Sequence, residues 1–385
     1  MKVAFIGQKG IPAKQGGVEK HVEELTVQLA DAGFDIYIYS RPYYTGQRHK
    51  YYRGVRIINL PSLKTKHLDA ISHTFLASVH AIFQKYDIIH YHGVGPSLLS
   101  WIPRVFCPKA KVIVTFHCLD RQHQKWGFFA KLMLTMGEWT ACRFPHQTIT
   151  ISKALQKYCQ IKFNRETTYI PNGFSEIKIN KKSAGQKILK KYNLNKDDYF
   201  LSVSRLVRHK GIHTLIEAYQ KINTDKKLVI AGDGANTDDY VNYLFGLAKG
   251  NKNIIFTGQQ TGANLQALYK NGYLFVQPSE AEGLSIALLE AMSYGLPVLI
   301  SDIKENQEVA SGLGLEFKNK NANSLKKQLE FSITHQEQIN NLARLAKKQI
   351  FKKYNWRDIA KQTVNLYKQT TEPANLLATN LQKAR

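Results

Sequence analysis

The chain of 385 residues carries 54 Lys and Arg against 29 Asp and Glu, a formal net charge of +25. This length exceeds one ordinary hydrophobic core and predicts two domains, and no apolar run is long enough to span a membrane. The four cysteines form no Cys-x-x-Cys pair, which indicates neither a zinc site nor a disulfide framework and favours a reducing compartment. The positive charge favours phosphates, nucleic acid or an anionic membrane surface as partners without choosing among them.

The first half of the sequence alternates between short apolar segments and amphipathic ones. Val3–Ile6 is predicted as a buried strand, Gly7–Gly17 as a glycine-rich loop, and Val18–Ala32 as a helix that Gly33 ends. The longest helix of this half is predicted at Lys125–Phe144. Further strands are predicted at Asp35–Tyr39, Val55–Leu60, Asp87–Tyr91, Lys111–Phe116 and Gln147–Ile151. This alternation predicts a parallel sheet covered by helices on both faces.

The same pattern starts again after Gly173. The segment Ile177–Tyr192 is rich in Lys and Asn and is interpreted as a linker or a surface excursion. Helices are predicted at Gly211–Lys221 and Trp356–Gln369. Further strands are predicted at Tyr199–Ser204, Lys227–Ala231, Asn253–Thr257, Tyr273–Gln277 and Pro297–Ser301. A second doubly wound α/β unit therefore follows the first. We predict domains at 1–172 and 173–353, a last helix at 354–371 and a tail at 372–385.

Two glutamates, Glu282 and Glu290, bracket an apolar helical segment that follows a predicted strand. Successive residues of an α-helix are rotated by roughly 100°, so two residues eight positions apart lie roughly 80° apart around the axis. The two carboxylates would therefore not share one face of a continuous helix, and we predict Glu282 in the loop and Glu290 in the helix. Gly283 permits the turn between them. Such a helix N-terminus suits a sugar attached to a diphosphate, because N–H groups hold phosphates and carboxylates accept hydrogen bonds from hydroxyls. The alternative is an ordinary amphipathic helix with two solvated glutamates.

Two further loops follow strands of the second half. Arg205 and Lys210 lie five positions apart before a helix, where their charges could neutralise a diphosphate leaving group. Gly232-Asp233-Gly234 ends another strand, and Asp233 is a candidate cap of the next helix. A solvated basic loop and a plain turn are the respective alternatives.

Four candidate residues lie in the first half. Gly16 and Gly17 close the loop after the first strand, and paired glycines let the backbone approach a phosphate. His117 ends a buried strand, at the edge of a parallel sheet where ligands bind, and Asp120 follows in the same loop. The alternative for the two glycines is a simple turn. The alternative for His117 is a side chain whose hydrogen bonds are made within the core.

Other polar segments are less specific. His90 and His92 alternate along a strand without a common zinc spacing, so we expect no metal there. The segment 125–136 mixes large apolar residues with lysines and could meet anionic lipid, or be a core-facing helix. The segment 41–53 interleaves aromatic and basic residues and could dock a glycan, a lipid headgroup or single-stranded nucleic acid, or be a solvated loop.

The motifs, taken together and in this order, resemble the GT-B glycosyltransferases of family 4, a large retaining group. The resemblance covers about residues 1–370, and its most specific part is the Glu-x7-Glu motif of Glu282 and Glu290 within 278–302. It implies two Rossmann-like domains facing a cleft, the first for the acceptor and the second for the nucleotide sugar. It also implies a last helix that crosses back to the first domain.

The resemblance implies a role for each matching position of the second half. Glu282 would contact the hydroxyls of the donor sugar, and Glu290 would bind the ribose of the nucleotide. Arg205 and Lys210 would hold the diphosphate. Backbone groups near Gly17 and Gly283-Leu284-Ser285, together with the Gly232-Asp233-Gly234 turn, would complete the substrate-binding set.

In the first half, the resemblance places His117 beside the transferred sugar. Many relatives have Asp or Gly directly after this histidine, whereas this chain has His117-Cys-Leu-Asp120, so Asp120 is a second candidate for the sugar's far hydroxyls. Family members need no metal, and the resemblance implies no cofactor and no general base. Front-side attack is the proposal usual for the family, in which the leaving phosphate helps to deprotonate the acceptor hydroxyl.

The sequence therefore predicts a cytoplasmic sugar transferase that moves a hexose from a nucleotide diphosphate sugar to a glycan or lipid-linked glycan in cell-envelope polysaccharide synthesis. Peripheral association with the inner face of the cell membrane is left open. A nucleotide-sugar epimerase or hydrolase of the same fold is one alternative. A nucleic-acid-binding protein, whose binding would fall steeply with salt, is the other. The base, the sugar, the acceptor, the linkage and the oligomeric state are not specified.

Overall fold

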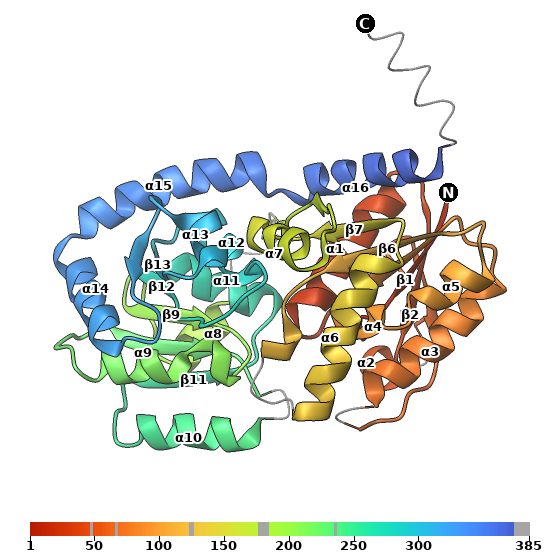
Figure 1. Ribbon diagram of the computed structural model, residues 1–385. Helices are drawn as coiled ribbons and strands as arrows, with labels where there is room; N and C mark the ends of the chain where they lie inside the picture. Colours follow the sequence, from red (N-terminus) through yellow and green to blue (C-terminus); the bar gives the residue numbers. More distant parts are fainter. Residues whose placement is uncertain (47–48, 66–67, 123–126, 176–184, 235–236, 373–385) are drawn as a thin grey trace, which may run out of the picture. The chain divides into compact units, whose positions relative to one another are not determined.

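The computed structural model describes residues 1–385 except 47–48, 66–67, 123–126, 176–184, 235–236 and 373–385 (Figure 1). The chain forms two compact units. The first comprises Met1–Asn172 together with the chain from Trp356 onward, and the second comprises Gly173–Asn355. Each unit is an α/β sandwich with its own sheet.

The sheet of the first unit has eight strands in the order β3-β4-β2-β1-β5-β6-β7-β8. All neighbouring strands are parallel except β3, which pairs antiparallel with β4 at one edge. The strands are β1 Lys2–Ile6, β2 Asp35–Ser40, β3 Tyr51–Tyr52, β4 Val55–Asn59, β5 Ile88–His92, β6 Lys111–Phe116, β7 Gln147–Thr150 and β8 Thr168–Tyr169. The central strands are buried along almost their whole length, as expected for a parallel sheet covered on both faces.

The helices of the first unit connect these strands. They are α1 Gly17–Asp31, α2 Pro42–Thr45, α3 Asp69–Ile82, α4 Val94–Ser97, α5 Trp101–Phe106, α6 Phe128–Arg143, α7 Lys153–Phe163 and α16 Trp356–Thr371, with one 3₁₀ turn at Asp120–Gln122. Because consecutive parallel strands require crossovers, their carboxyl ends all lie at one edge of the sheet. The loops at this edge carry His117 and the Gly16-Gly17 pair.

The second unit has a six-stranded, fully parallel sheet in the order β11-β10-β9-β12-β13-β14. Its strands are β9 Tyr199–Val203, β10 Lys227–Ala231, β11 Ile254–Gly258, β12 Leu274–Gln277, β13 Val298–Ser301 and β14 Leu315–Phe317. Its helices are α8 Gln186–Lys191, α9 Ile212–Tyr219, α10 Asp238–Ala248, α11 Gly262–Asn271, α12 Ile286–Ser293, α13 Lys304–Ala310, α14 Ala322–Thr334 and α15 Gln336–Lys353, with a 3₁₀ turn at Arg208–Lys210. The order is that of a Rossmann-like, doubly wound sheet.

The predicted strands are present, and each end differs from the prediction by at most one residue. The interpretation of Ile177–Tyr192 as a linker is wrong for its described part, because Gln186–Lys191 forms α8. Ile188 is buried there, and α8 packs on α11, so a single apolar anchor holds a helix rich in lysine. The helix predicted at Lys125–Phe144 begins at Phe128 among the described residues, and Lys125 and Trp126 lie outside them.

The last helix, α16, packs against α1 of the first unit (Figure 1). Trp356, Ile359 and Tyr367 belong to the same buried cluster as the strand residues Val3 and Phe5. The Tyr367 hydroxyl lies 2.6 Å from Nδ1 of His90 on β5, so a polar contact fixes the register of the helix within an apolar interface. The C-terminal helix is therefore part of the core of the N-terminal unit.

We expect Ile359→Ala to destabilise the first unit by about 2–5 kcal/mol, because the removed atoms leave a cavity in a fully buried position. Arg357→Ala on the exposed side of α16 is the matched control, expected to change stability by about 0.5 kcal/mol or less. Thermal and urea denaturation of the whole chain measure both. Equal effects of the two substitutions would contradict the assignment of α16 to this core.

Candidate functional site

The loop between β12 and α12 has the geometry that the two glutamates predict. Ser285 is the N-cap of α12, and its side chain accepts a hydrogen bond of 3.3 Å from the Leu288 N–H. Glu282 therefore lies in the loop and Glu290 within the helix, which confirms this part of the prediction. Gly283 and Leu284 are buried between them, so the loop backbone approaches the helix N-terminus closely.

The carboxylate of Glu282 is held by three donors. Its Oε1 accepts hydrogen bonds from Lys210 Nζ at 2.5 Å, Gln277 Nε2 at 2.7 Å and Ser279 Oγ at 2.8 Å. The side chains of Lys210 and Glu282 are only 15% and 7% exposed. An ammonium group has three N–H donors, so Lys210 can hold Glu282 and still donate to an anion. Oε2 of Glu282 accepts no hydrogen bond from the described residues and remains available to a hydroxyl.

Two glycines allow the loops around Glu282 to meet. At Gly211, where φ is +68°, a Cβ atom would lie 1.9 Å from the carbonyl oxygen of Pro278. At Gly232 a Cβ would lie 1.7 Å from the carbonyl oxygen of Ser204. Backbone hydrogen bonds of 2.8 Å, from Leu206 N–H to the Asp233 carbonyl and from Glu280 N–H to the His209 carbonyl, join the same loops. The predicted basic loop, the 232–234 turn and the glutamate loop are therefore neighbours.

Arg205 and Asp233 differ in the contacts that their side chains make in these loops. The Arg205 side chain is half-buried and makes no hydrogen bond or ion pair with the described part of the chain. The prediction that Asp233 caps the next helix is wrong, because α10 begins at Asp238 after Thr237. The Asp233 carboxylate instead accepts a hydrogen bond of 2.8 Å from the Gly234 N–H, which closes the turn on itself.

Glu290 has a partner that sequence reasoning missed. The Tyr269 hydroxyl donates to Oε2 of Glu290 over 3.2 Å, and the Tyr269 ring stacks on Tyr294 at 5.5 Å between centroids. Burial, followed by the nearby Glu290 charge, raises the pKa of Tyr269 well above its usual value, so the phenol stays a donor. Gln277 and Ser279 were also missed, although polar residues at the end of a buried strand are a usable signal.

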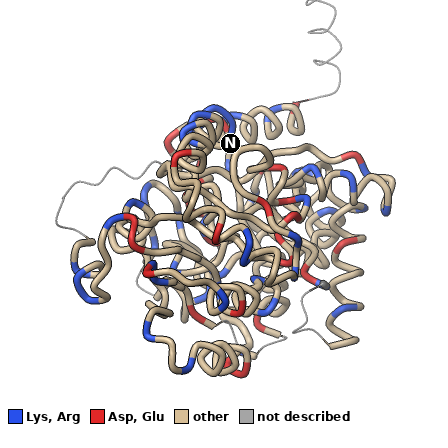
Figure 2. Tube along the Cα trace, turned by 90° about the vertical axis from the view of Figure 1, so that its left-hand side faces the viewer, with Lys and Arg blue, Asp and Glu red and all other residues tan. Residues whose placement is uncertain are grey.

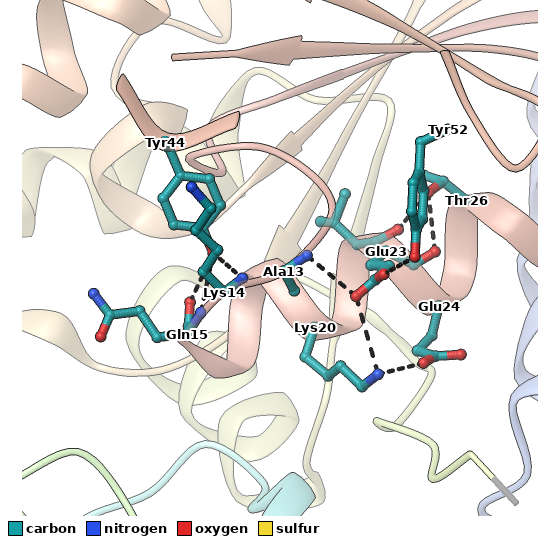
Figure 3. Close-up of polar contacts among 10 residues, drawn as sticks. Ala13, Lys14, Gln15, Lys20, Glu23, Glu24, Thr26, Tyr44 and Tyr52 are labelled. Carbon is teal, nitrogen blue, oxygen red and sulfur yellow. Dashed lines mark hydrogen bonds and ion pairs between the residues drawn. The ribbon is translucent and has the colours of Figure 1, made fainter. Parts of the chain in front are cut away.

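In the first unit, the loop before α1 is tied to neighbouring elements (Figure 3). The Tyr44 hydroxyl accepts hydrogen bonds from the backbone N–H groups of Lys14 at 2.6 Å and Gln15 at 3.1 Å. Glu23 of α1 accepts a hydrogen bond of 3.2 Å from the Ala13 N–H. The loop therefore has a defined shape.

Gly16 and Gly17 stand at the start of α1. Gly16 is the N-cap with φ of +101°, and a Cβ there would lie 2.1 Å from Oε2 of Glu19. A Cβ at Gly17 would meet nothing within 4 Å. The first glycine is thus required by the turn, whereas the second leaves an open approach to the helix N-terminus.

His117 follows β6 and belongs to a cluster of buried imidazoles. Its Nε2 lies 3.0 Å from Nδ1 of His92, and its ring meets that of His21 edge-on at 4.8 Å. Nδ1 of His21 lies 2.8 Å from Oδ1 of Asn172. Burial lowers the pKa of His21 to about 4 and lowers those of His92 and His117 well below the usual value, so the cluster is neutral at pH 7. His21, on α1, gave no sequence signal.

One nitrogen from each of these three histidines lies within 4.8 Å of the others. Nε2 of His21 and Nε2 of His92 are buried without a hydrogen-bond partner in the described part of the chain. Three neutral imidazoles are a donor set that zinc uses. Among the described residues this is the group that could hold a metal, and the expectation of a metal-free activity stays a prediction.

The loop after β6 is anchored by a charge pair. Asp120 begins a 3₁₀ turn and accepts a bond of 3.2 Å from Cys118 Sγ. The next residue, Arg121, donates through Nε to both carboxylate oxygens of Glu138, at 2.9 and 3.1 Å. Glu138 lies on α6 and is fully buried, and it also accepts a bond of 2.6 Å from the Tyr158 hydroxyl. This network fixes the backbone beside His117, and the sequence gave no sign of it.

Comparisons with known proteins agree with this architecture. Residues 15–176 match the model of the family described as Glycosyltransferase Family 4, and residues 185–349 match that of Glycosyl transferases group 1. Together the two models span most of the chain. The chain is therefore a glycosyltransferase with the GT-B fold.

Relatives and solved structures extend over both units. An uncharacterized glycosyltransferase of Methanocaldococcus jannaschii is 29% identical over 96% of this chain and 98% of its own. O-antigen chain mannosyltransferase C of Escherichia coli is 24% identical, covering 81% of this chain and 84% of its own. The crystal structure of Anabaena Alr3699/HepE in complex with UDP-glucose has a TM-score of 0.78 at 18% identity, covering 96% of this chain and 100% of its own.

We expect Gly211→Ala to lower the melting temperature of the second unit by clearly more than Gly312→Ala. Both glycines have a left-handed backbone, with φ of +68° and +71°, so each substitution costs about 1–2 kcal/mol from conformation alone. Only at Gly211 does a new methyl group meet another backbone, whereas Gly312 has open space. Equal shifts in calorimetry would show that the loops do not depend on this close approach.

Proposed function

We propose that the chain is a retaining hexosyltransferase that uses a nucleoside diphosphate sugar and a glycan or lipid-linked glycan acceptor. The observation that carries this proposal is the Glu282 carboxylate, fixed by Lys210, Gln277 and Ser279 beside the N-terminus of α12. It combines an acceptor for sugar hydroxyls with a cation and oriented backbone N–H groups for phosphate oxygens.

The donor would bind through three kinds of contact. Arg205, which has no ionic partner among the described residues, and Lys210 would neutralise the diphosphate while negative charge grows on it. Oε2 of Glu282 would accept hydroxyls of the sugar. Glu290, oriented by Tyr269, would bind the ribose hydroxyls. Each charge-assisted hydrogen bond contributes about 1.5–3 kcal/mol.

His117 would act as a neutral hydrogen-bonding group. Its pKa is well below the usual value because it is buried among other imidazoles, so it is unprotonated at pH 7 and is a poor general acid. We propose that it contacts a sugar hydroxyl, with Asp120 as the second candidate. The leaving phosphate would deprotonate the acceptor hydroxyl on the same face, which gives retention of configuration without a protein base.

The choice of substrates draws on the relatives. The Anabaena structure contains UDP-glucose, and the Escherichia coli relative is named for the O-antigen chain. A hexose donor and an envelope glycan acceptor, met in the cytoplasm, are the corresponding proposals for this chain. No described helix is both long and apolar enough to cross a membrane.

We expect UDP, GDP, dTDP or ADP to raise the melting temperature, one of them by more than the others, with or without Mg²⁺. At 100 times the dissociation constant the gain is about 2.7 kcal/mol, or roughly 5–10 °C for a unit of this size. Glu290→Ala should lose this gain and remain folded, because it removes a ribose contact. Glu330→Ala, an exposed glutamate on α14, should keep it.

Two results would count against the donor site. One is no stabilisation by any of the four nucleotides at millimolar concentration. The other is stabilisation that Glu290→Ala leaves intact. Donor turnover in the absence of any acceptor would instead favour the epimerase or hydrolase alternative. Figure 2 shows Lys and Arg spread along the described chain, with Asp and Glu between them, rather than gathered in one segment as a basic nucleic-acid-binding arm would be.

We also propose that the first unit rests on an anionic bilayer through α6. Phe128 and Phe129 at its N-terminus are 87% and 72% exposed, and Leu132, Met136 and Trp139 continue the same exposed apolar set. The opposite side of α6 packs on α4, so these exposed apolar side chains are not part of the core packing. Exposed lysine and arginine on the same helix suit anionic headgroups. Trp126, at the start of the predicted lipid-facing segment, lies outside the described residues.

We expect the protein to co-sediment with vesicles containing phosphatidylglycerol and to bind neutral phosphatidylcholine vesicles several-fold less. Phe128→Ser/Phe129→Ser should lower binding to the anionic vesicles, because two inserted aromatic side chains are lost. Ile161→Ser/Leu345→Ser, which alters two exposed apolar residues on other helices, is the matched control. Equal sedimentation with both vesicle types would remove this proposal and leave the donor site untouched.

A further inference from the structure

A pocket lies in the first unit, at the edge of the sheet opposite His117. It is a pocket of about 560 Å³ whose lining includes Arg104, Arg143, Arg165 and His146. Arg104 is on α5 before β6, Arg143 ends α6 before β7, and Arg165 lies between α7 and β8. In a parallel sheet these positions belong to the amino ends of the strands. The pocket is therefore separate from the site at the carboxyl ends.

In this pocket, the imidazole of His146 lies beside an N–H donor of Arg104 for which it has no free acceptor nitrogen. Nδ1 of His146 accepts a hydrogen bond of 2.9 Å from the Val112 N–H, while Nε2 lies 2.9 Å from Nη1 of Arg104. Burial, followed by the charges of Arg104 and Lys111, lowers the pKa of His146 to about 4, so the ring carries one proton. Because Nδ1 is the acceptor, that proton is on Nε2. Two N–H donors then face each other, an arrangement that an anion accepting from both would relieve.

The other two arginines add donors to the same space. Arg165 uses Nη2 to bind the carbonyl oxygens of Pro145 and His146 at 2.9 and 3.0 Å, but its Nε is buried with no hydrogen-bond partner. Arg143 is exposed and makes no hydrogen bond or ion pair with the described residues. The pocket thus combines one guanidinium group fixed by backbone carbonyls, that of Arg165, with N–H donors that have no acceptor.

Charge and size define the ligand class. Among the described residues of the lining, Glu372 is the one acidic side chain, so the three guanidinium groups leave an excess of two positive charges there. A phosphate monoester carries about −1.5 to −2 charges at pH 7, and guanidinium groups match its oxygens in bidentate fashion. Pockets for small ligands typically enclose about 300–1,000 Å³, so there is room for a phosphate group with a substituent.

We propose that this pocket binds a phosphate group, with Arg104, Arg143 and His146 Nε2 as its donors and Glu372 as the internal competitor. The phosphate belongs either to a soluble phosphorylated compound or to a lipid headgroup. A lipid source is sterically consistent, because Phe144 of the lining packs on Trp139 of the exposed apolar face of α6 at 5.5 Å between ring centroids. The inference does not depend on the proposed donor site.

The test is isothermal titration of the full chain with inorganic pyrophosphate. Arg104→Gln/Arg143→Gln should weaken one binding event tenfold or more, and Arg205→Gln should weaken a different one if the proposed donor site exists. Glu372→Gln should tighten the pocket event several-fold, because the competing carboxylate is removed. Arg344→Gln/Lys348→Gln, two exposed cations of α15, changes the net charge equally and should alter neither event.

The outcomes separate the two proposals. If pyrophosphate binding is the same in wild type and in folded Arg104→Gln/Arg143→Gln, as judged by melting temperature, the pocket proposal is wrong. The single variant Arg143→Gln repeats the test at an exposed side chain whose loss does not threaten folding. A single binding event that Arg104→Gln/Arg143→Gln removes and Arg205→Gln retains supports the pocket and contradicts the donor site.

Vesicles distinguish the source of the phosphate. We would compare wild type and Arg104→Gln/Arg143→Gln for co-sedimentation with phosphatidylcholine vesicles containing about 20% phosphatidic acid, a lipid charge density that attracts basic surfaces. A several-fold loss in the variant identifies the lipid headgroup as the ligand. Unchanged sedimentation, together with lost pyrophosphate binding, identifies a soluble phosphate compound. Unchanged behaviour in both assays overturns the inference.

Discussion

The loops at the candidate site of the second unit meet around the pairing of Glu282 with Lys210. Taking two charges out of water costs several kcal/mol each, and the pair recovers this only because Gln277 and Ser279 add hydrogen bonds in fixed positions. That geometry requires loops from different strands to touch, which Gly211 makes possible. A buried ion pair is weak support for stability, and its place beside the N-terminus of α12 agrees with the binding role that we propose.

The two units treat charge in opposite ways at the carboxyl ends of their sheets. The first brings together His21, His92 and His117 as neutral imidazoles, because burial disfavours the charged form of each and lowers its pKa. The second brings together the charged side chains of Lys210 and Glu282, with Arg205 in the same loop as Lys210. In the proposed donor site, the two basic side chains would hold the diphosphate and Glu282 would accept a sugar hydroxyl, whereas the imidazoles of the first unit would offer hydrogen bonds without charge.

The sequence predicted the parts of this molecule that are local in the chain. The strand Lys227–Ala231 was predicted with its exact bounds because a continuous apolar run is typical of a strand buried on both faces. The helix α8 was missed because one buried residue, Ile188, holds it. At the candidate site, the spacing of the two glutamates predicted that Glu282 lies in the loop. The sequence did not indicate that Lys210, 72 positions away, contacts Glu282. Tyr269 lies on α11 and His21 lies on α1. The residues next to them in the sequence do not indicate that Tyr269 contacts Glu290 or that His21 contacts His117.

The arrangement around Glu282 bears on how the proposed donor site would place a carboxylate beside a phosphate. Two negative charges at short range would repel strongly in a partly buried environment. Lys210 uses one N–H for Oε1 of Glu282 and could donate others to a bound phosphate, so the cation would lie between the two negative groups. Because Oε1 already accepts from three donors, Oε2 would be the oxygen that accepts from a sugar hydroxyl. In the proposed site, the contact with Lys210 would thus fix the carboxylate, lower its repulsion toward the phosphates and select the oxygen that meets the sugar.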